Sequence, residues 1–240
     1  MRALAVLFML PLMACSAGAA ETGDAVEPRG QGPSRSYDVS GFTEVGLRGS
    51  DDVDVRVGPA FSVRAQGPAD ELDRLEIVRE GDALRIGRKR TAGMKWGRQQ
   101  GVKVFVTLPR LAKAGVAGSG DMAVDRVEGD RFEGAVAGSG NLLIGRMDVG
   151  EARLAVAGSG DLTGAGRARR LDMSVAGSGD IDARQVTAAQ AKVALAGSGD
   201  VRARVDGPVE VDLVGSGDVE LTGSPRCTIN RRGSGAVRCD

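Results

Sequence analysis

Oxygen-bearing side chains that recur at a fixed spacing are the first candidates for chemistry in this sequence. The triplet Gly-Ser-Gly occurs seven times, with first glycines at 118, 138, 158, 177, 197, 215 and 233. Six of the triplets are followed by a carboxylate or amide residue: Asp121, Asn141, Asp161, Asp180, Asp200 and Asp218. Calcium takes oxygen ligands of this kind, so a row of weak cation sites is one hypothesis. The other is that each side chain accepts backbone N–H groups of its own turn, as Asx turns do.

The serines of the triplets do not predict catalysis. Gly-Ser-Gly lacks the Gly-x-Ser-x-Gly frame of a nucleophile elbow. The 240 residues include no histidine, which excludes Ser-His and Cys-His nucleophilic machinery and His-ligated metals. Aromatic side chains that could stack on sugars are few: one Trp, one Tyr and five Phe. We therefore predict a protein that is not an enzyme and carries no cofactor other than calcium. A polysaccharide-active β-helix enzyme is the alternative.

The first of the three cysteines indicates export. Arg2 is followed by an apolar stretch over residues 3–14, and Leu12-Met13-Ala14-Cys15 resembles a bacterial lipobox. We predict a signal peptide with lipobox over 1–15, lipidation of Cys15, and a flexible linker over 16–36, which is rich in Gly, Pro, Ser and charge. Ser16 after the cysteine favours an outer-membrane lipoprotein facing the periplasm or the surface. Ordinary signal-peptidase cleavage after Ala19 is the alternative.

The other two cysteines, Cys227 and Cys239, stand six residues before and six residues after the last triplet glycine, Gly233. They would oppose each other across the interior of one coil. In an oxidising compartment this arrangement predicts a disulfide. Two small buried thiols are the alternative.

A basic segment over residues 85–103 is the remaining candidate site. It contains no acidic residue and gathers cations around the one tryptophan: Arg88, Lys89, Arg90, Lys95, Trp96 and Arg98. The segment is either a solvated loop or a contact for anionic headgroups, lipopolysaccharide or an acidic polysaccharide. Over the whole chain 32 basic residues balance 32 acidic ones, so nucleic-acid binding through bulk electrostatics is not expected.

The elements that must position these residues follow from the repeat. Apolar and polar residues alternate on both sides of each triplet, as in strands with one buried face. The triplets recur every 18 to 20 residues, so each repeat is one coil whose apolar face is buried only by stacking. We predict an all-β, right-handed parallel β-helix, regular over 118–240. The N-terminal β-rich part, 37–117, fits the same plan less regularly, with a degenerate turn at Gly49-Ser50-Asp51-Asp52. It is expected to form the first coils and an irregular cap with hairpins.

The order of short motifs before the repeats resembles one family. Gly-Phe-Thr-Glu-Val (41–45), Val-Asp-Val (53–55), Phe-Ser-Val (61–63) and Gly-Asp-Ala-Leu-Arg-Ile (81–86) come first. Val-Phe-Val-Thr-Leu-Pro-Arg-Leu (104–111) then leads into the first triplet. This order is similar to the bacterial head GIN domain family, described as autotransporter adhesin heads and often as lipoproteins.

The resemblance covers about residues 37–240 and implies a β-helical envelope protein without catalytic residues. Its expected role is an adhesin-like or structural binding module. A polysaccharide or lipopolysaccharide binder acting through the basic segment is the alternative. The expected partners are the membrane, through the lipid anchor, and a cell-surface glycan or envelope protein. The sequence leaves the oligomeric state open.

Overall fold

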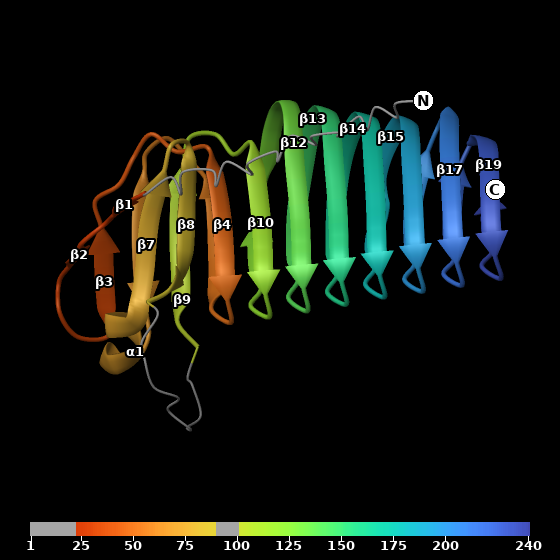
Figure 1. The fold of residues 1–240 in the computed structure, drawn as a ribbon. Helices are drawn as coiled ribbons and strands as arrows, with labels where there is room; N and C mark the ends of the chain where they lie inside the picture. Colours follow the sequence, from red (N-terminus) through yellow and green to blue (C-terminus); the bar gives the residue numbers. More distant parts are fainter. Residues whose placement is uncertain (1–22, 90–100) are drawn as a thin grey trace, which may run out of the picture.

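The computed structural model describes residues 23–89 and 101–240, and these confirm the predicted all-β parallel solenoid. Strands make up 69% of the structure and helix 3%, and the stacked coils complete about six turns. In Figure 1 the strands that precede the triplets lie side by side in one row, and the triplet corners line the lower edge. The predicted signal peptide, Cys15 and residues 16–22 lie outside the described residues.

The regular coils are joined in register from one repeat to the next. Val136 pairs with Val156 and Gly138 with Gly158, so equivalent residues form straight columns along the solenoid. The strands of this part are β10 (Lys113–Gly118), β11 (Met122–Val124), β12 (Val127–Gly138), β13 (Leu142–Gly158), β14 (Leu162–Gly177), β15 (Ile181–Gly197), β16 (Val201–Val205), β17 (Pro208–Gly215), β18 (Val219–Gly223), β19 (Arg226–Gly233) and β20 (Val237–Cys239).

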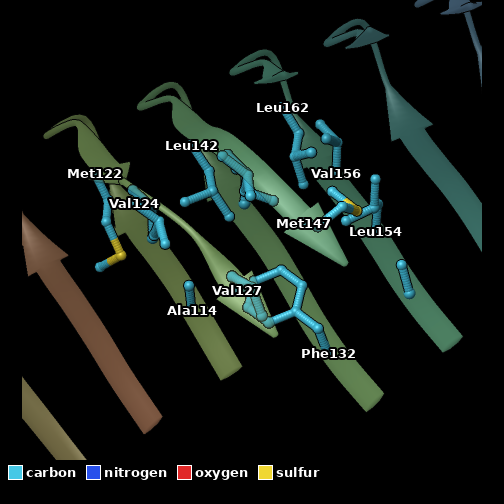
Figure 2. Close-up of a cluster of buried hydrophobic side chains, with 14 of the residues drawn as sticks. Ala114, Met122, Val124, Val127, Phe132, Leu142, Met147, Leu154, Val156 and Leu162 are labelled. Carbon is cyan, nitrogen blue, oxygen red and sulfur yellow. The ribbon is translucent and has the colours of Figure 1, made fainter. Parts of the chain in front are cut away.

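The inward columns form one continuous apolar core. Met122, Leu142 and Leu162 follow one another on successive coils in Figure 2, and each is at most 1% exposed. The larger side chains Phe132 and Met147 fill the same interior. Burial of one such side chain stabilises the fold by about 1.5–3 kcal/mol. The period-two pattern therefore supplies the core, and stacking closes it.

The triplet corner requires glycine at two positions for steric reasons. Gly158, the first residue of its triplet, has φ +128°. A Cβ on it would lie 2.4 Å from the carbonyl oxygen of Gly138 on the preceding coil. A Cβ on Gly160, the third residue, would lie 1.9 Å from the carbonyl oxygen of Gly140. Successive corners thus touch backbone to backbone, and any larger residue would push the coils apart.

The solenoid starts before the first triplet. β4 (Glu44–Gly49) and β5 (Asp52–Val57) stack in register on β10 and β11. The stack therefore continues in register from about residue 44, in agreement with the expectation that the N-terminal part supplies the first coils. The degenerate turn at Gly49 occupies the corner column, which explains why the stack starts before the first triplet.

The cap contains the predicted hairpin at Gly81. β7 (Leu75–Glu80) and β8 (Ala83–Arg88) are antiparallel around this residue. β6 (Ser62–Gln66) also pairs antiparallel, with the more distant strand β9 (Lys103–Leu108). A short helix that the sequence did not predict, α1 (Ala69–Arg74), joins β6 to β7. The cap therefore places antiparallel strand pairs at the end of a stack whose other strands pair in parallel.

Part of the segment predicted as a flexible linker is paired to this cap. β1 (Asp24–Ala25) runs antiparallel to β7. β2 (Pro28–Arg29) pairs with β3 (Ser34–Tyr37), which in turn pairs with β6. The edges of β6 and β7 present backbone groups that need partners, and the segment supplies them. Over residues 23–36 the structure therefore differs from the predicted linker.

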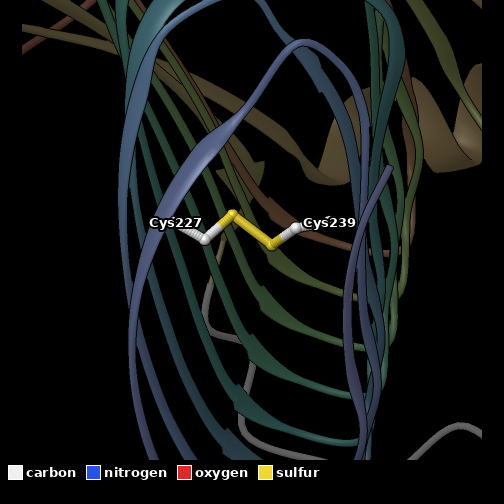
Figure 3. The surroundings of a disulfide bond; sticks show 2 residues. All are labelled: Cys227 and Cys239. Carbon is white, nitrogen blue, oxygen red and sulfur yellow. A yellow bond between two sulfur atoms is a disulfide. The ribbon is translucent and has the colours of Figure 1, made fainter.

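The disulfide between Cys227 and Cys239 is present, as predicted. Figure 3 shows it crossing the interior of the coil between β19 and β20, with the two Cα atoms 6.7 Å apart. A bridge across a loop of this length contributes about 2–4 kcal/mol. The disulfide links the two sides of that coil across its interior.

Within residues 23–89 and 101–240, no helix combines the length and the apolar character that crossing a membrane requires.

Replacing Gly160 by alanine tests the corner. We expect Gly160→Ala to lower the free energy of unfolding by about 2–4 kcal/mol, because the added Cβ meets backbone that is fixed on both sides. Gly115→Ala is the matched control: a Cβ there would have its nearest neighbour at 4.0 Å, and the same column holds Ala135 and Ala155 on later coils. It should change stability by less than about 1 kcal/mol. Urea unfolding followed by circular dichroism measures both, and equal losses would contradict the steric account.

Candidate functional site

The triplet corners form an exposed edge that runs the length of the regular coils. The serine of every triplet is exposed: Ser119, Ser139, Ser159, Ser178, Ser198, Ser216 and Ser234. Because the coils are in register, these hydroxyl groups recur about every 4.8 Å. The carboxylate and amide residues that follow the triplets form a second row beside them. We call the two rows together the repeat corner.

The second row is held by hydrogen bonds between coils. Oδ1 of Asp121 accepts the backbone N–H of Asn141 at 2.9 Å, and Oδ1 of Asn141 accepts that of Asp161 at 3.0 Å. The same bond recurs up the solenoid from the N–H groups of Asp180, Asp200, Asp218 and Ala236, at 2.9, 2.7, 2.9 and 2.8 Å. The prediction that each side chain bonds within its own turn is therefore wrong. In-register stacking brings the next coil's amide within reach instead.

These bonds offset the repulsion between neighbouring carboxylates. Two unit charges about 4.8 Å apart repel by about 1 kcal/mol in water. Each coil-to-coil hydrogen bond to a carboxylate stabilises the fold by a comparable free energy. Near the C-terminal end Arg202 adds a cation, 2.6 Å from Oδ2 of Asp200 and 3.5 Å from Oδ2 of Asp180. The neutral Asn141 also separates Asp121 from Asp161, so the row has several sources of compensation.

The cation hypothesis stays a prediction. Among residues 23–89 and 101–240, no group of three acidic, Cys or His side chains is placed to hold a metal ion. One oxygen of each carboxylate in the row is committed to an amide of the next coil. A calcium ion would therefore have to share the remaining oxygens of separate coils.

Arg88 does not belong to an anion-binding surface. Its Nε lies 2.8 Å from Oδ2 of Asp51, and its other nitrogens contact Asp51 and Glu71. Asp51 is 0% exposed and also accepts the backbone N–H of Val102 at 3.0 Å. The hydrogen bond to Asp51 raises the pKa of Arg88 further above its ordinary value, so the guanidinium stays charged. The prediction that Arg88 contacts an anionic ligand is therefore wrong, because the cap uses it to neutralise two carboxylates.

Asp51 marks the point where the corner column begins. It stands where later corners have the third glycine of the triplet. A Cβ on the next residue of that column, Gly120, would lie 2.0 Å from the carbonyl oxygen of Asp51. On its other side Asp51 faces the end of β8, where its carboxylate meets Arg88.

For the other residues of the basic segment, contact with an anionic ligand stays a prediction. Lys89 is exposed, and its backbone N–H donates to the carbonyl of Arg74 at 2.8 Å. Arg90, Lys95, Trp96 and Arg98 lie outside the described residues. Contact with an anionic ligand is therefore proposed only for these five residues, without Arg88.

A further set of exposed residues was missed by sequence reasoning. The residue five positions before each of the first six triplets alternates in charge along the solenoid: Lys113, Glu133, Arg153, Asp172, Lys192 and Glu210. The register places these residues in one outward column, which we call the charged column. Two pairs of neighbours in this column form ion pairs: Lys113 with Glu133 at 2.6 Å, and Lys192 with Glu210 at 3.1 Å. Aligning the repeats on their glycines would have revealed the alternation.

Substitution of Asp161 tests the coil-to-coil bond. Oδ1 of Asp161 accepts the N–H of Asp180 at 2.9 Å. Asp161→Ala removes this acceptor, and we expect a loss of about 1 kcal/mol in the free energy of unfolding. Asp161→Asn keeps the acceptor, as Asn141 does, and should stay within about 0.5 kcal/mol of the original. Urea denaturation of the two variants decides it: an Asn variant as unstable as the Ala variant would rule out the amide bond as the reason for the row.

Solved structures share the fold at low sequence identity. A crystal structure described as "a putative adhesin" from Bacteroides fragilis superimposes with a TM-score of 0.77 and 18% identity, covering 85% of this chain and 94% of that one. A "putative lipid binding protein" from Parabacteroides distasonis gives 0.70 and 24%, covering 88% and 97%. A "putative adhesin" from Parabacteroides merdae gives 0.64 and 16%, covering 87% and 96%. These likenesses show the fold.

Among curated proteins none matches this chain. The family model described as "Putative auto-transporter adhesin, head GIN domain" matches residues 41–225. That range begins just before β4 and ends just before β19, the strand that carries Cys227. It contains the predicted motifs and six of the seven triplets. The chain belongs to the head GIN domain family of adhesin-like proteins.

Proposed function

We propose that this protein is a non-enzymatic, adhesin-like binding module of the bacterial cell envelope. The observation that carries the proposal is the repeat corner, where exposed serine hydroxyls and a row of carboxylates recur once per coil. Backbone contact between the coils fixes this spacing, so the groups are held in place before a partner arrives. Little conformational entropy is then lost on binding.

The chemistry of the repeat corner favours a glycan partner that repeats along its length. Hydroxyl and carboxylate groups form hydrogen bonds with sugar hydroxyls and with amino sugars, whereas a polyanionic glycan would be repelled by the carboxylate row. A partner that engages several coils at once gains affinity from each added contact. We therefore propose an extended neutral or amino-sugar polymer of a cell surface as the ligand.

The lipid anchor at Cys15 is part of the proposal. Membership of an adhesin-like family supports an extracellular or envelope location, and the lipobox supplies a means of attachment. We propose an outer-membrane lipoprotein that faces the periplasm or the surface.

Detergent-phase partition of the full chain tests the anchor. The protein made in a bacterial host should enter the detergent phase, because a lipidated cysteine adds acyl chains that favour the micelle. Cys15→Ser should shift the protein to the aqueous phase or leave the signal segment uncleaved, which mass spectrometry distinguishes. A processed Cys15→Ser protein that still enters the detergent phase would contradict lipidation at this residue.

Binding to glycan polymers of graded length tests the repeat corner. Affinity for a matching neutral or amino-sugar polymer should rise with the number of sugar units, because longer polymers reach more coils. Replacing Ser159 and Ser178 together by Lys places long side chains over the row and should weaken binding at least about tenfold. Surface plasmon resonance on immobilised polymers, including peptidoglycan sacculi, provides the measurement.

The matched control replaces Thr163 and Thr187, two exposed hydroxyl residues outside the triplets, by Lys. It also replaces two hydroxyl groups by two ammonium groups and adds the same charge, and it should leave affinity within about twofold. If the control variant loses as much affinity as the corner variant, or if affinity does not depend on polymer length, the repeat corner is not the binding site.

A further inference from the structure

The row of strands that carries the charged column has a flat outer face. Between the charged column and the repeat corner, the outward positions are small on five coils: Gly115, Ala135, Ala155, Ser174 and Ala194 form one column, and Ala117, Ala137, Ala157, Ala176 and Ala196 form the next. On the sixth coil, β17, the two columns continue with Asp212 and Val214. In Figure 1 this is the face of β10, β12, β13, β14, β15 and β17 that is turned towards the viewer. Side chains this short allow another sheet to approach closely. We call this surface the flat face.

In the middle of the charged column the two neighbouring charges do not pair with each other. Lys113 and Glu133 pair with each other, as do Lys192 and Glu210. Arg153 and Asp172 stand next to each other in the column, but they form ion pairs elsewhere, with Glu151 at 2.8 Å and with Arg170 at 3.0 Å.

A hollow of about 340 Å³ lies at this point, lined by Glu133, Arg153, Asp172 and Lys192 together with small residues of the flat face. The side chain of Arg153 is 55% exposed and that of Lys192 is 42% exposed. Alternating charges therefore surround an open, small-walled depression in the centre of the face.

We propose that the flat face binds a second copy of this chain about a two-fold axis that runs parallel to the strands between Arg153 and Asp172. With such an axis, each column of one chain faces the same column of the second chain. The coils of the two chains then run in opposite order along the interface. Arg153 then faces Asp172 of the second copy, Glu133 faces Lys192, and Lys113 faces Glu210. All three pairs have opposite charge, and each occurs twice, as a two-fold interface requires. An axis passing through a coil would set Arg153 against itself.

The area of the face is sufficient for a dimer. Six coils at about 4.8 Å and six residues of strand at about 3.3 Å give about 600 Å² of projected surface per copy. Side-chain relief adds to this projected value, and a standard interface buries about 800 Å² per partner. On five of the six coils the floor consists of Gly, Ala and Ser, and the charge that flanks it is self-complementary. The axis sets Asp212 and Val214 of the sixth coil against Gly115 and Ala117, the small residues of the first coil in the second copy.

The arrangement also has a consequence for the proposed binding surface. A two-fold axis parallel to the strands leaves both repeat corners on the same side of the dimer. The second copy would double the rows of serine and carboxylate groups without covering them. The dimer does not depend on the glycan proposal, and either can fail alone.

Cross-linking between two variants, each with one added cysteine beside the Cys227–Cys239 disulfide, tests the dimer. The axis sets Ala135 of one copy against Ala194 of the other, whereas within one chain these residues are three coils, about 14 Å, apart. We expect a mixture of Ala135→Cys and Ala194→Cys chains, treated with a short bis-maleimide, to yield a covalent dimer that contains one of each. Either variant alone should yield at least about tenfold less, because like positions lie about 14 Å apart across the axis.

Sedimentation of the purified full chain in density-matched detergent provides the second measurement. Wild type should sediment at twice the chain mass, and Arg153→Asp should weaken association at least about tenfold, since it sets two pairs of like charges face to face. The double variant Arg153→Asp, Asp172→Arg should restore it, whereas Arg146→Asp, an exposed change away from the face, should have no effect. A monomeric wild type at about 100 μM, a concentration far above the dissociation constants of ordinary interfaces, overturns the proposal. Equal cross-linking of like and unlike variants does the same.

Discussion

The fold depends on one contact: the backbone of each triplet corner rests directly on the backbone of the corner before it. At Gly160 the space between a Cβ and the preceding carbonyl oxygen would be 1.9 Å, so only glycine permits the coils to come together. The N–H groups of Ser159 and Gly160 both donate to the carbonyl of Gly138, at 2.8 and 3.0 Å. This contact sets the register of every coil, and the register in turn aligns the apolar columns into one core.

The same register places equivalent outward residues of successive coils in columns. In such a column the side chains are either of one type or of alternating charge. Stacking would be penalised if like charges simply accumulated, and the structure avoids this in two ways. In the carboxylate row, each Oδ1 accepts an amide of the next coil, as between Asp161 and Asp180. In the charged column the sign alternates, so neighbours such as Lys113 and Glu133 attract. A surface of this kind is rigid, linear and periodic, which suits partners that are themselves extended.

The sequence was sufficient to predict the coils, their apolar core and the disulfide. The glycine spacing predicted the coils, the period-two pattern predicted their core, and the placement of Cys227 and Cys239 around one triplet predicted the disulfide. Features that depend on distant partners were not predictable in this way. The acceptor in Asp121 meets an amide 20 residues later, and Arg88 meets Asp51 37 residues earlier. Neither pairing leaves a local pattern, because the coil that joins the partners must form first.

Amide hydrogen exchange at the corners tests the central claim most directly. The corner amides of Ser159, Ser178 and Ser198 lie at the solvent-exposed edge, yet each donates to a glycine carbonyl of the preceding coil at 2.8 Å. If backbone contact at the corners holds the solenoid together, these amides should exchange within about tenfold of the rate of the buried strand amides of β13 to β15. Corner amides that exchange as fast as those of an open loop, while the strands stay protected, would contradict it.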